Sequence, residues 1–190
     1  MDIIDVIRDR RTVGKSTGAI SRETVLELIE AATWAPNHKL TQPWRFTIVD
    51  GDEREALGRV WAERAAASID PAARPAFIEG EAAKPLRAPM LIVVSTCTDP
   101  NPVRAEEDLT ATAAAVQNLL LVAHAKGLSA AWKTGMIVYD DAVKAFLGLQ
   151  TADRIVAIVY LGATALETPA PRERDVRACV NWLADSRVLA

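Results

Sequence analysis

Residues 90–95 have the sequence Met90-Leu91-Ile92-Val93-Val94-Ser95, and this apolar run is the strongest fold signal in the chain. A run without alternating polar residues is typical of a strand that is buried on both faces. Residues 154–161 form a second run of the same kind, which ends at Gly162. Shorter strands are expected at residues 45–49 and 129–134. The sequence therefore predicts one compact domain of the α/β or α+β class, over residues 1–190.

The expected helices carry apolar residues at helical spacing. Residues 2–10 place Ile3, Ile4, Val6 and Ile7 on one face. Ser21 is a suitable N-cap for a second helix, which must end near Pro36. A third helix is expected at residues 52–67, and a short one begins after Asp140 and ends at Gly148. Residues 68–88 contain several prolines and are expected to be irregular or partly helical.

Residues 104–126 are expected to form the longest helix. This segment is apolar for most of its length, so it belongs in a core or an interface. A helix of this kind needs a buried partner on more than one face, which favours an obligate dimer. The positions that carry this expectation are Leu109, Ala113, Val116, Leu120 and Ala123.

Composition limits the possible partners. The 190 residues carry a net charge of -3, which gives no electrostatic case for nucleic acid or an anionic membrane. No apolar stretch approaches the roughly 20 residues that a membrane helix needs. The first residues lack the pattern of a secretory signal, so a cytoplasmic protein is expected. Cys97 and Cys179 are accordingly expected to be buried, reduced thiols.

Four segments carry residues suited to binding an anionic, ring-containing ligand. Arg10-Arg11-Thr12 offers two guanidiniums and a hydroxyl, which can grip a phosphate or polarise ring carbonyls. The alternative is a solvated basic helix end, which the helix dipole favours. Residues 35–46 place His38 and Gln42 in a loop between a helix and a strand. The amide of Gln42 suits a uracil-like edge, although a lone histidine is more often structural.

The other two segments lie later in the chain. Trp132-Lys133-Thr134-Gly135 ends an expected strand, and its small residues let backbone N–H groups approach a flat ligand. Arg172 and Arg174 can clamp a phosphate, or they can form an ordinary surface charge cluster. Either segment alone is ambiguous.

Two kinds of site are not supported. Gly14-Lys15-Ser16 imitates the end of a phosphate-binding P-loop, but Asp9 occupies the position of the first glycine. The segment also follows an expected helix and not a strand, so nucleoside triphosphate binding is not predicted. A metal site is not predicted either, because the two histidines form no ligand motif.

Taken together, these segments resemble the nitroreductase family of FMN oxidoreductases, in particular its short members. The likeness extends from Ile3 to about Val176, with the motifs in the family's order. Its other parts are Ala35-Pro36 with Gln42-Pro43-Trp44, Gln117-Asn118-Leu119 in the long helix, and Gly127-Leu128 before the Trp132–Gly135 strand end. Thr12 stands where the family usually has serine, which keeps the hydroxyl.

The resemblance implies an α+β fold with a mixed, mainly antiparallel sheet flanked by helices. It also implies an intertwined homodimer with FMN at the interface. Arg10, Arg11, Thr12, Trp132, Lys133, Thr134 and Gly135 would contact the flavin, and Arg172 and Arg174 would meet its phosphate. His38 and Gln42 would come from the other chain. A weaker implied set for the nicotinamide coenzyme is Val122, Ala123, His124, Ala125, Lys126 and Gly127.

The implied activity is NAD(P)H-dependent reduction of a nitroaromatic, a quinone or another electron-poor small molecule. The cofactor carries the redox chemistry, so no side chain is assigned as acid or base. Coenzyme and acceptor would use one flavin face in turn, which is a ping-pong scheme. Two alternatives stay open. One is a protein that binds or senses FMN without turnover, and the other is a specialised flavin enzyme of the reductive dehalogenase or flavin-destroying type.

Overall fold

The computed structural model describes residues 2–165, 169–170 and 173–183. Its centre is a four-stranded sheet in the order β2-β3-β5-β4, built from Trp44–Asp50, Met90–Thr96, Arg154–Gly162 and Ser129–Lys133. All pairings within it are antiparallel, so the expected mainly antiparallel sheet is confirmed, without a parallel pair in the described part of the chain. A two-stranded ribbon pairs β1 (Ser16–Thr17) with β6 (Thr164–Ala165).

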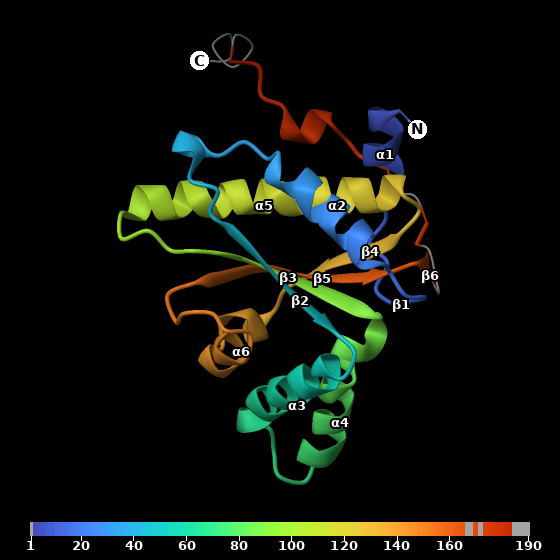
Figure 1. Ribbon diagram of the computed structural model, residues 1–190, viewed down its shortest axis with the longest axis vertical. Helices are drawn as coiled ribbons and strands as arrows, with labels where there is room; N and C mark the ends of the chain where they lie inside the picture. Colours follow the sequence, from blue (N-terminus) through green and yellow to red (C-terminus); the bar gives the residue numbers. More distant parts are fainter. Residues whose placement is uncertain (1, 166–168, 171–172, 184–190) are drawn as a thin grey trace.

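Helices cover both faces of this sheet, as Figure 1 shows. On one face lie α2 (Arg22–Thr33) and the long helix α5 (Pro102–Ala125). On the other lie α3 (Glu53–Ala65) and α6 (Asp141–Phe146), with α4 (Arg74–Ala82) packed beside α3. This double cover explains why β3 is buried throughout: Ile92 and Val94 face one core, whereas Leu91 and Val93 face the other.

Helix ends follow the capping chemistry expected from the sequence. Ser21 accepts a hydrogen bond from the N–H of Thr24 and begins α2. Asp140 caps α6 in the same way. Helix α5 begins earlier than expected because Asn101 accepts from the N–H groups of Val103 and Arg104, with Pro102 in the first turn.

The region between β2 and β3 is more helical than expected. Residues 68–88 contain α4 and the 3-10 turn Lys84–Arg87. Helix α4 packs tightly on α3 at Gly58, where an added Cβ would stand 2.4 Å from the carbonyl oxygen of Ala82. A glycine is therefore required at this crossing.

The expectation of buried cysteines is wrong. Cys97 and Cys179 are both free and exposed. Cys97 lies just beyond the end of β3, so it is outside the sheet that buries the preceding residues.

Helix α1 (Ile3–Asp9) shows its apolar face to solvent in the single chain. Only Val6 is buried, whereas Ile3, Ile4 and Ile7 are about half exposed. The C-terminal segment 173–183 extends away from the sheet (Figure 1), and Val176, Val180 and Trp182 on it are also exposed. Among the described residues, no helix combines the length and hydropathy needed to cross a bilayer.

Candidate functional site

Arginines expected to contact the cofactor converge on one cavity. Arg10, Arg11, Thr12 and Arg174 line a space of about 620 Å³, together with Arg8 and Asp9 from the end of α1. Arg174 comes from the C-terminal segment, so the cavity joins two parts of the chain that are far apart in sequence. Arg172, the other expected partner, lies outside the described residues. Four guanidiniums and one carboxylate make this cavity suitable for an anion.

The arginine segment is fixed against strand β4. The N–H of Val13 donates to the carbonyl oxygen of Ala130 at 3.0 Å. Next to it, the ammonium Nζ of Lys133 lies 3.6 Å from the position that a Cβ would take on Gly14. The predicted ligand residues Arg10–Thr12 and Lys133–Gly135 are therefore neighbours.

The end of β4 is open to a ligand. Gly135 has φ 134° and ψ -178°, and apart from its chain neighbours no described residue comes within 4 Å of the position of a Cβ there. Only glycine adopts this backbone conformation readily. The backbone at residues 134–135 can consequently be approached closely by a flat group.

Trp132 has a structural role that the sequence did not reveal. Between the pairs Val94–Ala157 and Ser95–Ile155 the register shifts, so Val156 is an extra residue in β5. The indole Nε1 of Trp132 donates to the carbonyl oxygen of Val156 at 3.0 Å. The side chain packs against the core, which leaves the backbone of Trp132 as its means of contacting a ligand.

His38 and Gln42 lie elsewhere in the chain. His38 lines a different cavity, together with Glu107, Thr110 and Ala114 near the beginning of α5. The arginine segment lies near the other end of that helix, at Leu120 and His124. The fourteen residue-to-residue steps of helix from Thr110 to His124 span about 21 Å. One chain therefore does not bring His38 to its own arginine cavity.

The loop that carries His38 and Gln42 is held in an unusual conformation. Lys39, Leu40 and Gln42 have positive φ values between 45° and 55°. The N–H of Gln42 donates to Asn37 Oδ1 at 3.0 Å, and Thr41 Oγ1 donates to Asp108 Oδ1 at 2.7 Å. Such strain persists only where surrounding contacts enforce it, and it is frequent at ligand sites.

The weaker nicotinamide set is only partly accessible. His124 and Gly127 line a cavity of about 490 Å³ with Arg10 and Arg11. The buried nitrogens Nε of Arg11 and Nε2 of His124 have no partner among the described residues. Ala123 is buried in the core, and Lys126 is ion-paired with Glu27. Val122 packs against the core, and Ala125 is exposed.

A further cavity of about 420 Å³ opens beside Thr134 and Gly135, and the sequence motifs did not indicate it. It is lined by residues of α3, α4 and the segment after β4, among them Trp61, Arg64, Glu81, Lys84, Tyr139 and Asp140. Most of these residues belong to helices of ordinary amphipathic composition. No local pattern shows that they meet.

Comparison with known proteins shows the family of the chain. The family model "Nitroreductase family" matches residues 7–163. A Bacillus subtilis protein named "Putative NAD(P)H nitroreductase YfhC" is 32% identical over 163 residues, 83% of this chain and 82% of its own length. The chain therefore belongs to the nitroreductase family. Relatives of this chain are named as putative NAD(P)H nitroreductases, which are oxidoreductases.

Solved structures show the same fold. A nitroreductase-like family protein from Bacillus cereus superposes with a TM-score of 0.84 at 30% identity, over 96% of both chains. A Desulfovibrio desulfuricans structure, described as a "putative nitroreductase in complex with fmn", superposes with a TM-score of 0.70. Its identity is 24% over 95% of both chains, so this likeness concerns the fold.

Proposed function

We propose that the protein is an FMN-dependent oxidoreductase that uses NAD(P)H to reduce nitroaromatic, quinone or related electron-poor acceptors. The observation that carries the proposal is the convergence of Arg10, Arg11, Thr12 and Arg174 on one cavity, next to Val13, which is hydrogen-bonded to Ala130 of β4. The choice of FMN and NAD(P)H is supported by relatives that are named NAD(P)H nitroreductases and by a structural neighbour that was solved with FMN.

The residues present fit FMN. The arginine-lined cavity suits the phosphate, and the open backbone at Gly135 suits the edge of a planar ring. The ammonium of Lys133 and the guanidinium of Arg10 would stabilise negative charge on a bound ring. Bound FMN would supply the two-electron redox chemistry, and the chain would supply orientation and positive charge.

The complete site is proposed to need a dimer. His38 and Gln42 would reach the flavin of the partner chain, because one chain holds them at the opposite end of α5 from its own arginines. The exposed isoleucines of α1 are available for such an interface. His124 and Gly127 are the members of the nicotinamide set that share a cavity with Arg10 and Arg11, and they are retained as coenzyme candidates.

The overall reaction balances as a two-electron exchange. NAD(P)H, one proton and a quinone give NAD(P)+ and the hydroquinone. If both substrates use one face, the coenzyme leaves before the acceptor enters, and double-reciprocal plots are parallel. Intersecting plots would contradict the shared face while leaving the flavin proposal intact.

The visible spectrum of the purified protein tests the proposal. We expect flavin absorbance that bleaches with NAD(P)H and returns when a quinone is added. A protein that shows no absorbance and does not quench added FMN would refute the proposal. A protein that binds FMN but does not oxidise NAD(P)H would instead be a flavin-binding module.

A further inference from the structure

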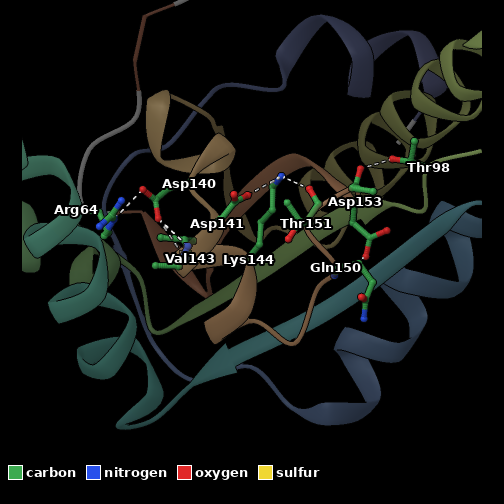
Figure 2. Close-up of polar contacts among 11 residues, drawn as sticks. Arg64, Thr98, Asp140, Asp141, Val143, Lys144, Gln150, Thr151 and Asp153 are labelled. Carbon is green, nitrogen blue, oxygen red and sulfur yellow. Dashed lines mark hydrogen bonds and ion pairs between the residues drawn. The ribbon is translucent and has the colours of Figure 1, made fainter.

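The loop between α2 and β2 is fixed at both of its ends. At its beginning, the N–H of Ala35 donates to a carbonyl oxygen in the last turn of α2. At its end, the carbonyl oxygen of Pro43 accepts from the N–H of Cys97, just beyond β3. Thr98 in turn donates through Oγ1 to the carbonyl oxygen of Ala152, and Figure 2 shows its side chain directed at that segment. The ends of the loop are therefore held by α2 and by the end of the sheet.

The middle of the loop has one anchor outside itself. Thr41 Oγ1 donates to Asp108 Oδ1 of α5 at 2.7 Å. Among the described residues, this is the only hydrogen bond that joins residues 37–42 to an element distant in the sequence. The others lie within the loop or reach the adjoining residues Ala35 and Arg45. Three of these residues have a positive φ without being glycine, so the contact with Asp108 ties a strained segment to α5.

Asp108 is an unusual residue for its place in the fold. It is 7% exposed and lies on the face of α5 that also buries Ala111, Thr112 and Ala115. It is the only charged side chain that is buried in the described part of the chain, and no cation there is paired with it. Burial of an unpaired carboxylate is costly, and an apolar residue would fill the core without that cost. The hydroxyl of Thr41 is the one side-chain donor that the structure directs at this carboxylate.

The anchored loop leaves one amide free to bind. The N–H of Gln42 donates to Asn37 Oδ1 at 3.0 Å, and its carbonyl oxygen accepts from Arg45 Nη1 at 3.2 Å. The backbone of Gln42 is thus engaged on both sides. Its side chain is exposed and has no hydrogen-bond partner among the described residues. This amide can both donate and accept.

We propose that Asp108 is a positioning residue for the flavin site: through Thr41 it fixes the loop in the conformation that presents the amide of Gln42 to the cofactor of the partner chain. The inference rests on the proposed function, in which Gln42 reaches that flavin. Asp108 acts from the core of its own chain by restricting the loop. A loop that is ordered beforehand loses less conformational entropy when the cofactor binds, so removal of the anchor weakens binding.

Fluorescence titration of the full-length apoprotein with FMN tests this role. Thr41→Val removes the hydroxyl at an exposed position and keeps the shape of the side chain. We expect the dissociation constant of FMN to rise roughly tenfold, the effect of losing one charge-assisted hydrogen bond. Thr41→Ser keeps the hydroxyl and should restore the affinity. Thr33→Val is the matched control, because it removes an exposed threonine hydroxyl that bonds to Glu30 within α2, and it should leave the dissociation constant unchanged.

Double variants assign the effect to the proposed chain of contacts. Asp108→Ala combined with Thr41→Val should weaken FMN binding no more than either change alone, because each removes the same hydrogen bond. If Asp108→Ala does not fold, the Thr41 variants decide. In a Gln42→Ala background, Thr41→Val should likewise add no further loss. The absorbance band of bound FMN is a readout that a loss of stability alone would not move, and Thr41→Val should shift it in the same direction as Gln42→Ala.

The outcomes separate this inference from the proposed function. Unchanged FMN affinity in Thr41→Val, an equal loss in Thr33→Val, or a loss that adds fully to that of Gln42→Ala would overturn the positioning role. FMN binding and NAD(P)H oxidation by the wild type would persist in each of these cases. A wild type that does not bind FMN would overturn the proposed function and this inference together.

Discussion

The indole Nε1 of Trp132 donates a hydrogen bond to the carbonyl oxygen of Val156, 3.0 Å away, at the point where β5 carries an extra residue. A bulge removes one residue from the regular ladder, and a side chain supplies the hydrogen bond instead. The strand end that leads to Thr134 and Gly135 is thereby fixed to the centre of the sheet.

Trp132→Phe should destabilise the fold by about 1 kcal/mol, because it removes this hydrogen bond and keeps most of the packing. Urea unfolding should show a lower midpoint with an unchanged slope. FMN affinity should change little, since the side chain faces the core. Trp34→Phe is the control: Trp34 is 78% exposed and its indole can bond to water instead of Glu30. Equal destabilisation by both variants would contradict this role.

Arg10→Ala should weaken FMN retention. A charge-assisted hydrogen bond contributes on the order of 1.5–3 kcal/mol, which corresponds to a dissociation constant raised roughly 10- to 150-fold. Fluorescence titration of the apoprotein with FMN measures it, with the exposed Arg22→Ala as control. Full affinity in Arg10→Ala would mean that Arg10 does not contact bound FMN.

Ile4→Glu combined with Ile7→Glu should dissociate the dimer. Both side chains are about half exposed in the single chain, and charges there would be costly to bury in an interface. Sedimentation velocity should show a monomer that has lost FMN, while far-ultraviolet circular dichroism stays unchanged. Leu26→Glu, at an exposed position on α2, should remain dimeric. A wild-type monomer loaded with FMN would contradict the shared site.

Asp140→Asn should lower stability at neutral pH, and the deficit should disappear in acid. Partial burial raises the pKa of Asp140, but hydrogen bonds from Arg64, Ala142 and Val143, together with the charge of Arg64, outweigh it and leave the pKa below its ordinary value. Because the pKa is lower in the folded protein, the charged carboxylate contributes stability at pH values above the pKa of an unfolded aspartate, about 3.9. This contribution is lost as the pH falls through the pKa that Asp140 has in the folded protein. The side-chain oxygen of asparagine can still accept the N-cap hydrogen bonds, so the difference in stability between the two proteins reports the charge of Asp140. The free energy of unfolding of both proteins, measured at pH 7 and below pH 3, tests this prediction. A loss of stability that is the same at both pH values would show that the charge of Asp140 is not involved.

ATP and GTP should not bind through Gly14-Lys15-Ser16. Ser16 is buried in β1, where it pairs with Ala165 of β6, and the segment follows helix α1. No strand-to-helix turn is present there to direct backbone N–H groups at phosphates. Calorimetry should detect no tight nucleotide binding, and binding that Lys15→Ala abolishes would reverse this conclusion.

The sequence by itself determined the elements whose signals are local. The apolar runs that form β3 and β5 are strands in the structure, and Ser21 and Asp140 cap their helices as expected. An uninterrupted apolar run and a capping side chain are each contained within a few residues, so they leave a readable pattern in the sequence. The Arg10–Thr12 and Trp132–Gly135 segments could be singled out for the same reason.

Only the tertiary structure decided which of these segments line the same cavity. Arg174 lines the same cavity as Arg10 although the two are far apart in the sequence, whereas His38 is separated from Arg10 by much of α5. The Arg64–Asp140 pair and the cavity around it come from the packing of α3 and α4 beside the end of β4. Even Cys97 is exposed because the sheet ends one residue before it. Which residues line a common cavity, and which are exposed, depends on packing between elements that are distant in the sequence. No local sequence pattern reports that packing.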